Sequence, residues 1–253
     1  MSSKDLTYFV SDVHLGLQVG DPAMREKKFV AFLRSIDPAQ TDALYLLGDI
    51  WDFWYEYKDV VPKGYVRVFA ALTELMDAGV KVYFFTGNHD IWAYSYFEEL
   101  GMRRLQQPHV TEIGGKRFCL GHGDGLGPGD YGYKCMRWIF HNRFFQRLFS
   151  ALPPHWAFSL GNGWSRRSRL GKQICYHFRG EDERLYKYCV RFHAHMPVNY
   201  FIFGHYHCQV DMPVEGGARL LLLGDWITAP NWICYSRMSG VSICGGSSQK
   251  TDQ

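Results

Sequence analysis

The stretch "FFTGNHDIW", Phe84 to Trp92, decides how this chain of 253 residues folds and where its chemistry lies. Apolar and β-prone residues from Val80 to Thr86 end abruptly in Gly-Asn-His-Asp. An amide, an imidazole and a carboxylate therefore crowd together where a buried strand stops, and such groups need partners. The partner is a metal, a phosphate or solvent, and the rest of the sequence decides between these.

The composition is typical of a globular protein. Hydrophobic residues make up 47% of the chain, enough for one large domain or a domain with a sizeable insertion. A formal charge of +3 is too small to attract the phosphate backbone of nucleic acid strongly, so we expect no nucleic-acid partner. Seven cysteines without CxxC spacing argue against a disulfide framework and favour a reducing cytoplasm.

The sequence shows no membrane-spanning or secretory pattern. The first residues lead directly into a strand-like segment, and we expect no secretory signal. No apolar stretch approaches the roughly 18 residues of a spanning helix, so any membrane contact is expected to be peripheral.

Strand-like and helix-like segments alternate along the chain. Strands are predicted over 6–12, 42–49, 80–90, 117–124, 198–207 and 218–226, and amphipathic helices over 25–36 and 66–79. In open α/β sheets, ligand sites form where the carboxyl ends of strands converge, so side chains distant in sequence meet there. We therefore predict an α/β fold with its site at the strand ends.

Residues 131–191 break this alternation. They form aromatic and arginine-rich helical segments, which we interpret as a helical cap insertion within a single domain spanning residues 1–253.

Five predicted strand ends carry side chains that bind metals: Asp12, His14, Asp49, Asn88, His89, His122, His205 and His207. The D-x-H and H-x-H spacings place both side chains of a pair on one side of an extended strand end, which suits chelation. Seven of the eight make a two-metal shell. Imidazole, carboxylate and amide oxygen fit divalent manganese, iron, zinc, cobalt or magnesium, and the absence of cysteine argues against structural zinc.

A single D-x-H or H-x-H motif is more often a solvated or hydrogen-bonded pair. We interpret His193 and His195 in that way, because they lie outside any strand-end glycine motif.

The five motifs, in this order, resemble the calcineurin-like metallophosphoesterase superfamily. Its signature is D-x-H, G-D-x-x-D/E, G-N-H-D/E and two late Gly-His motifs, and the resemblance covers about Ser11 to Trp226. It implies a four-layer αββα sandwich and in-line hydrolysis of a phosphoester or phosphoanhydride by two divalent metals.

The resemblance also implies a role for each residue. One metal would be held by Asp12, His14 and His207, the other by Asn88, His122 and His205, and Asp49 would bridge them. His89 would act on the scissile phosphate by stabilising charge or protonating the leaving group, with Asp90 orienting it. Asp52 and Asp124 are expected to support the ligands by hydrogen bonding.

The segment after His122 is similar to the UDP-2,3-diacylglucosamine pyrophosphatase family of the lipid A pathway, in which HGD is followed by an Asp, a Tyr and an aromatic, arginine-bearing cap. This similarity implies hydrolysis of UDP-2,3-diacylglucosamine to UMP and 2,3-diacylglucosamine 1-phosphate, usually with manganese, in a Gram-negative bacterium. The substrate contacts that it implies are Asn88, Asp130, Tyr133 and Lys172.

The cap has the composition that two acyl chains require. An apolar groove is expected from Trp138, Ile139, Phe140, Phe144, Phe145, Leu148 and Phe149, although aromatic residues at helical spacing are more often core. Arg137, Arg143 and Arg147 would meet diphosphate or anionic head groups. We expect a cytoplasmic protein held peripherally on the cytoplasmic face of the inner membrane, with no obligate protein partner.

Two other functions stay open. The lipid A enzymes usually have arginine where this chain has His89, so a related glycolipid diphosphate, another phosphodiester or a soluble nucleotide is an alternative substrate. A non-catalytic scaffold of the same fold is the third hypothesis, and the intact ligand set and His89 argue against it.

Overall fold

The computed structural model describes residues 4–129, 131–170 and 177–246. Its first sheet has the strand order β11-β10-β1-β2-β3-β4, and its second sheet has the order β5-β6-β7-β9-β8. The strands are β1 (Leu6–Val10), β2 (Thr41–Leu47), β3 (Lys81–Phe85), β4 (Arg103–Leu105), β5 (His109–Ile113), β6 (Lys116–Leu120), β7 (Tyr200–Phe203), β8 (Val210–Val214), β9 (Ala218–Leu222), β10 (Asn231–Ser236) and β11 (Gly240–Gly245). The helices are α1 (Pro22–Ser35), α2 (Val66–Asp77), α3 (Tyr96–Glu99), α4 (Tyr131–His141), α5 (Arg143–Ser150), α6 (Pro154–Leu170), the 3-10 helix η1 (Gly180–Asp182) and α7 (Arg184–His195).

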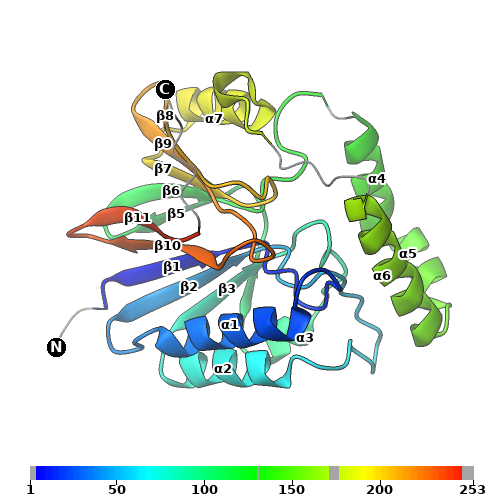
Figure 1. Cartoon of the computed structure of the whole chain (residues 1–253). Helices are drawn as coiled ribbons and strands as arrows, with labels where there is room; N and C mark the ends of the chain where they lie inside the picture. Colours follow the sequence, from blue (N-terminus) through cyan, green and yellow to red (C-terminus); the bar gives the residue numbers. More distant parts are fainter. Residues whose placement is uncertain (1–3, 130, 171–176, 247–253) are drawn as a thin grey trace.

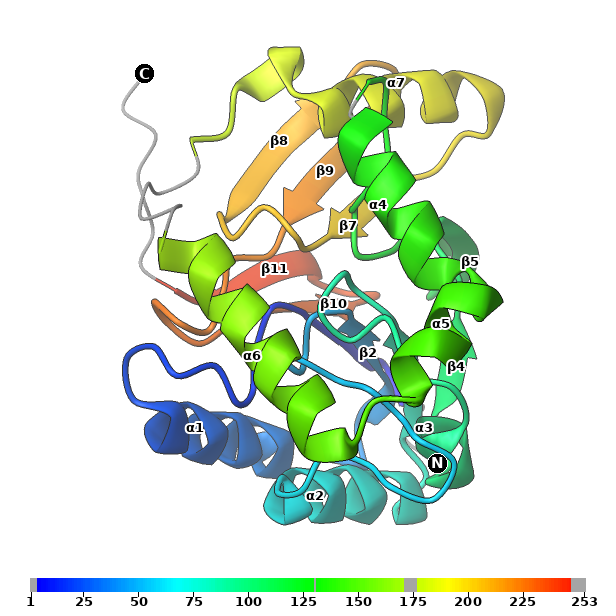
Figure 2. The same ribbon diagram turned by 90° about the vertical axis from the view of Figure 1, so that its right-hand side faces the viewer.

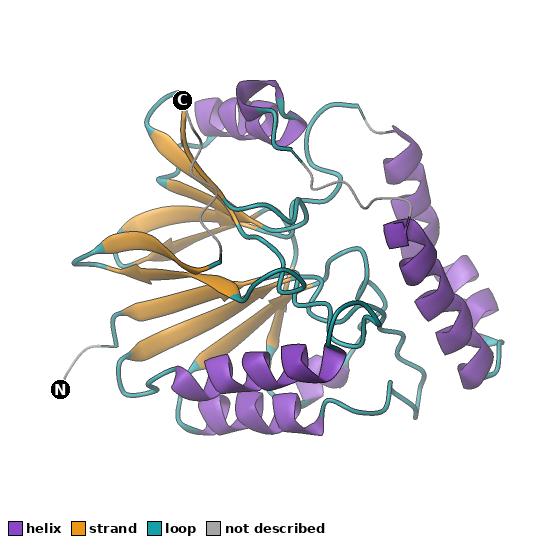
Figure 3. Ribbon diagram, viewed as in Figure 1, coloured by secondary structure: helices purple, strands orange, loops and turns teal. Residues whose placement is uncertain are grey.

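The two sheets pack face to face between layers of helix. Helices α1 and α2 cover the outer face of the first sheet, and α7 covers the second (Figures 1 and 3). The side chains of strand β2 alternate between two apolar clusters, which explains this layering. Leu44 and Leu46 pack with the helices, while Tyr45 and Leu47 point into the apolar layer between the sheets. Such a strand is buried on both faces. The predicted four-layer αββα sandwich is confirmed.

The helices of the first layer begin and end where local chemistry favours it. The Asp21 carboxylate accepts a hydrogen bond from the Met24 amide at 2.9 Å and caps α1, and Pro22 stands in its first turn. Helix α2 is followed by Gly79, whose φ of 83° is the left-handed conformation that glycine adopts at low cost.

Parallel pairing brings the carboxyl ends of the strands that precede the predicted ligands to one edge of each sheet. Strands β1, β2 and β3 run parallel in the first sheet, and β6, β7 and β9 run parallel in the second. Because the two sheets face each other, the turns after these strands lie close together (Figure 1).

Helices α4, α5 and α6 stand beside the sandwich, on the side of these strand ends (Figures 1 and 2). Much of their contact with it is aromatic: Trp92 stacks on Phe149 with ring centroids 5.3 Å apart and meets Phe140 at 5.1 Å. The Trp92 indole N–H also donates to the Phe140 carbonyl at 3.0 Å. Tyrosine hydroxyls of the 53–57 loop donate to two further carbonyls of this segment.

The predicted insertion, 131–191, also includes the first part of α7. Leu185, Tyr186 and Cys189 of that helix pack in the apolar cluster of the second sheet. Helix α7 thus forms the fourth layer of the sandwich, and we propose that the cap consists of α4, α5 and α6. Within the described residues, no helix combines the length and the apolar content needed to cross a membrane.

Candidate metal centre

The predicted ligands follow the strand ends of both sheets. Asp12 and His14 follow β1, Asp49 follows β2, and Asn88 follows β3. On the second sheet, His122 follows β6, and the pair His205 and His207 follows β7. The structure brings all seven side chains into one cluster of contacts, which are described below.

The turns that carry these residues have unusual backbone conformations. The described non-glycine residues with positive φ are Asp12, His14, Asp49, Tyr65, His205 and His207, with φ between 50° and 70°. All but Tyr65 are predicted ligands. A left-handed backbone costs about 1 to 3 kcal/mol at a non-glycine residue, and such strain concentrates at functional sites.

Two glycines make room for the carboxylates. A Cβ atom on Gly87 would collide with Asp49 Oδ1, and one on Gly204 would collide with Asp12 Oδ2 and Ser11 Oγ. The Gly-Asn-His motif and the second Gly-His motif therefore need glycine at these two positions, because the backbone passes directly against a ligand carboxylate.

The first group of ligand atoms surrounds Asp12 Oδ1. This buried oxygen has no hydrogen-bond partner among the described residues and lies 3.3 Å from His207 Nε2 and 3.7 Å from His14 Nε2. The two imidazole Nε2 atoms are 3.4 Å apart. Atoms that ligate one ion at about 2.1 Å are separated by roughly 3.0 to 3.4 Å. Both contacts of His207 fall in this range and the contact between His14 and Asp12 is slightly longer, so the group suits a divalent cation.

The second group surrounds His122. Its Nε2 atom lies 3.3 Å from Asn88 Oδ1, and its ring lies 5.1 Å from that of His205, measured between centroids. Asp49 connects the two groups, because its Oδ2 atom is 3.4 Å from His122 Nε2 and 3.8 Å from His14 Nε2. This is the position that a bridging carboxylate would occupy.

Charge in this buried centre is balanced locally. Burial alone would raise the pKa of Asp12, but His207 and His14 hold that pKa well below its usual range. In the same way, His122 and His89 overcome the effect of burial on Asp49 and lower its pKa. Burial would lower the pKa of His122, whereas the Asp49 carboxylate raises it to about 10. A cation bound here would replace the His122 proton, so metal binding would release protons.

Groups outside the ligand set hold the imidazoles. His14 Nδ1 lies 3.3 Å from the Asp52 carboxylate, which agrees with the supporting role expected of Asp52. His122 Nδ1 lies 2.9 Å from the Leu47 carbonyl, and His207 Nδ1 lies 3.1 Å from the Asp225 carboxylate. Asp225 is not among the residues predicted from the sequence, although Gly-Asp after β9 repeats the pattern that identified Asp49.

His89 stands beside the first group rather than in it. Its ring meets that of His14 edge-on, with centroids 5.0 Å apart, and its Nδ1 atom lies 2.8 Å from the Asp52 carbonyl. The backbone N–H of His89 donates to Asp49 Oδ1 at 2.9 Å. An Nδ1–H that donates to Asp52 leaves Nε2 to exchange a proton with a substrate.

Asp90 acts on the backbone around His89. Its carboxylate accepts the amides of Gly87 at 2.7 Å and Ile50 at 2.9 Å, with weaker contacts to the amides of Asp49 and Trp51. Burial and the Asp49 carboxylate raise the pKa of Asp90 to about 7. Asp90 thus ties the turn after β3 to the turn after β2, so any effect on the orientation of His89 passes through this backbone.

Of the predicted substrate contacts, Asn88 belongs to the second group and Tyr133 lies near it. The Tyr133 hydroxyl donates to Asp124 Oδ2 at 2.8 Å, and the Tyr133 ring lies 6.0 Å from that of His205. Arg137 Nε is 3.1 Å from the same carboxylate oxygen. Asp124 therefore joins α4 to the turn that carries His122. The predicted contacts Asp130 and Lys172 lie outside the described residues.

The apolar residues of the cap divide between two surroundings. Phe140 and Phe149 pack on Trp92, as described above, and are core to the docking of the cap. Trp138, Phe144, Phe145 and Leu148 are exposed, and Trp138 shows 62% of its surface. Arg137 is engaged by Asp124, whereas Arg143 and Arg147 are exposed.

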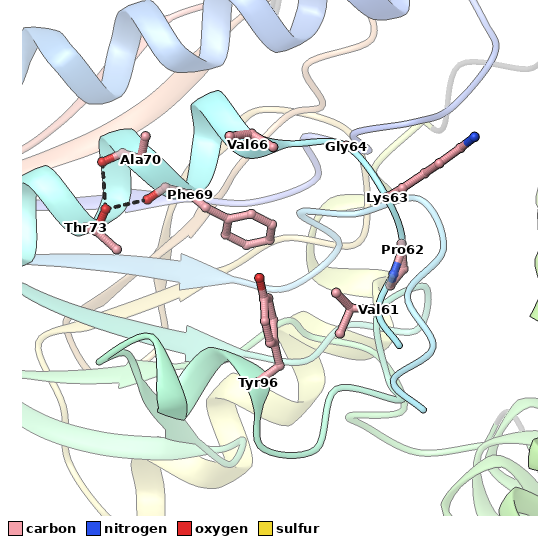
Figure 4. A pocket seen from close by; sticks show the side chains of 9 residues that line it. All are labelled: Val61, Pro62, Lys63, Gly64, Val66, Phe69, Ala70, Thr73 and Tyr96. Atoms are coloured by element: carbon pink, nitrogen blue, oxygen red, sulfur yellow. Dashed lines mark hydrogen bonds between the residues drawn. The ribbon is translucent and has the colours of Figure 1, made fainter. Parts of the chain in front are cut away.

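A separate surface hollow lies at the start of α2 (Figure 4). Its lining is a set distinct from the predicted ligands: Val61, Pro62, Lys63, Gly64, Val66, Phe69, Ala70, Thr73 and Tyr96.

Comparison with known proteins gives a consistent result. Residues 7–209 match the family model of the calcineurin-like phosphoesterases. A UDP-2,3-diacylglucosamine hydrolase of Porphyromonas gingivalis is 37% identical over 240 residues, which cover 87% of this chain and 90% of that protein. The enzyme of the same description from Neisseria gonorrhoeae is 32% identical, covering 87% of this chain and 89% of that protein. The one from Serratia proteamaculans is 35% identical over 66% of this chain and 68% of its own length.

Proposed function

This chain belongs to the calcineurin-like phosphoesterase family, and from that premise we propose that it hydrolyses the diphosphate of UDP-2,3-diacylglucosamine to UMP and 2,3-diacylglucosamine 1-phosphate. Membership of the family, the hydrolases among its relatives and the cluster of Asp12, His14, Asp49 and His207 together identify it as a metal-dependent hydrolase. The substrate is supported by the relatives described above, which bear the name of that hydrolase and align with most of this chain.

The observation that carries the metal-dependent chemistry of the proposal is the position of Asp49. Its Oδ2 atom lies between His14 on one side and His122 on the other, at 3.8 and 3.4 Å. In the proposed centre, Asp12, His14 and His207 would hold one cation, Asn88, His122 and His205 would hold the second, and Asp49 would be shared between them. Divalent cations bound there would supply Lewis-acid charge to the phosphate oxygens and a hydroxide source at neutral pH. Manganese is the metal that we propose.

His89 is the proposed proton carrier. Its side chain is about one-fifth exposed, at 18%, while His14 beside it is fully buried. The contact between Nδ1 and the Asp52 carbonyl fixes the ring, so Nε2 is the atom that meets a substrate. A protonated His89 would stabilise charge on the phosphate and donate its Nε2 proton to the leaving oxygen.

The cap is proposed to bind the glycolipid. Tyr133 and the residues outside the described ranges, Asp130 and Lys172, would contact the polar part of the substrate, together with Asn88. The exposed aromatic residues of α4 and α5, with Arg143 and Arg147 nearby, suit acyl chains and anionic head groups. We propose that the same surface holds the protein peripherally on the cytoplasmic face of the inner membrane.

The decisive experiment is a hydrolysis assay on UDP-2,3-diacylglucosamine in detergent with added manganese, in which the products are identified by mass spectrometry. UMP together with 2,3-diacylglucosamine 1-phosphate supports the proposal. The Asp49→Ala variant is the negative control for contaminating hydrolases. Turnover of simple phosphodiesters without turnover of the glycolipid would retain the metal centre and refute the substrate.

A further inference from the structure

Asp225 lies in the turn after β9, at a strand end that supplies none of the proposed ligands. Its Oδ2 atom is 3.1 Å from His207 Nδ1. Its Oδ1 atom accepts the backbone N–H of Thr228 at 2.7 Å, and its carbonyl accepts the side-chain amide of Asn231 at 3.0 Å. The carboxylate is therefore held from its own turn while it faces the imidazole.

The same turn is fixed to the other side of the centre. The backbone N–H of Trp226 donates to the Asp12 carbonyl at 3.0 Å. The buried Trp226 ring packs edge-on against Phe29 and Phe32 of α1, with centroids 5.3 and 5.6 Å apart. The turn after β9 thus contacts both Asp12 and His207, and it is anchored in the core beneath them.

His207 depends on such a partner more than His14 and His122 do. His14 and His122 are completely buried, so packing restricts their rings, whereas the His207 side chain is 27% exposed. A neutral imidazole carries one N–H, and the partner of that N–H decides which nitrogen can bind a metal. For His207, that partner is Asp225.

We propose that Asp225 is a positioning residue of the metal centre: it accepts the Nδ1–H of His207 and thereby turns the Nε2 lone pair toward Asp12 Oδ1. This inference rests on the proposed role of His207 as a ligand. It goes beyond that role, because it assigns the orientation and the tautomer of the ligand to a residue of another strand end.

The Asp225→Asn variant changes the tautomer with almost no change in shape. The Thr228 N–H still requires an acceptor, so the amide oxygen stays at the Oδ1 position and the amide nitrogen faces His207. Nδ1 must then accept a hydrogen bond, and the ring proton moves to Nε2, where it blocks the metal. We expect the affinity for Mn²⁺ to fall by about 10- to 100-fold.

The test measures Mn²⁺ affinity by elemental analysis after equilibrium dialysis of the wild-type chain, Asp225→Asn and Asp211→Asn. Asp211 is paired with Arg219 at the surface of β8, so its variant controls for loss of a carboxylate. Thermal unfolding in EDTA shows whether each variant folds. Equal Mn²⁺ affinity of Asp225→Asn and the wild-type chain would overturn the inference and leave the proposed function intact. A wild-type chain that binds no Mn²⁺ would refute the metal centre itself.

A second measurement does not depend on the folding of any variant. In the metal-free wild-type chain, at a pH high enough for the His207 ring to be neutral, the ¹⁵N chemical shifts of His207 are expected to show the single ring proton on Nδ1. A His207 proton on Nε2 would overturn the inference. If Asp225 had a purely structural role, the His207 ring would populate both neutral tautomers.

Discussion

Replacing Trp92 with alanine tests whether α4 and α5 dock on the sandwich as a separate unit. The indole meets two rings of the cap, Phe140 and Phe149, and donates one hydrogen bond to a cap carbonyl. Aromatic pairs contribute about 0.5 to 1.5 kcal/mol each beyond burial, and a hydrogen bond contributes a similar amount. We therefore expect the free energy of local opening of the cap to fall by about 2 to 4 kcal/mol. The loss is not larger because the hydroxyl contacts of Tyr55 and Tyr57 with the cap remain.

Native-state hydrogen exchange measures this opening directly. A loss of about 2 to 4 kcal/mol accelerates exchange of the amides in α4 and α5 by roughly 30- to 1,000-fold, while the amides of β1 and β2 keep their protection. Trp138→Ala is the matched control, because this tryptophan of α4 is largely exposed. Equal exchange of α4 and α5 in both variants would refute the idea that Trp92 holds the cap. Acceleration that extends to β1 and β2 would mean that the cap and the sandwich unfold together.

Four further outcomes are expected. Asp49→Ala should lose hydrolysis, because the bridge serves both cations, and wild-type turnover in this variant would contradict the dinuclear centre. His89→Ala should keep its metal in elemental analysis and lose about 100- to 10,000-fold in turnover; loss of the metal would instead make His89 a ligand. Lys172→Ala should raise KM for the glycolipid more than for p-nitrophenyl phosphate, and equal effects would remove Lys172 from substrate recognition. Manganese at 100 times its Kd should stabilise the metal-free chain by about 2.7 kcal/mol, seen as a raised Tm, and an unchanged Tm would argue against the site.

Much of the sandwich could be predicted from the sequence because its central elements are strongly patterned. The predicted strands at 6–12, 42–49 and 80–90 overlap β1, β2 and β3, and those at 117–124, 198–207 and 218–226 overlap β6, β7 and β9, with β2 and β6 each beginning one residue earlier than predicted. Strands β4, β5, β8, β10 and β11 were not predicted, and two of them, β4 and β8, have weak signals for identifiable reasons. Strand β8 contains Pro213, which only an edge strand tolerates, and β8 is indeed at the edge of its sheet. Strand β4 has three residues and two arginines.

The sequence predicted which residues form the site but not how they are arranged in space. Polar residues after glycine at strand ends identified the residues that the structure brings together, because parallel strands end at one edge. Spacing along the chain could not show that Asp49 Oδ2 lies between His14 and His122, since this depends on how the two sheets face each other. It also could not show which aromatic residues of the cap pack on Trp92, because this depends on which face of each cap helix lies against the sandwich.

The division of the ligands between two sheets has a consequence for stability. Asp12 and His14 belong to the first sheet and His207 to the second, while Asn88 faces His122 and His205 across the same boundary. Each bound cation would therefore cross-link the two halves of the sandwich. A substitution that loosens the apolar layer between them, such as Phe118→Ala, is expected to weaken metal binding without touching a ligand. Activity lost through such a distant change would return when the metal concentration is raised.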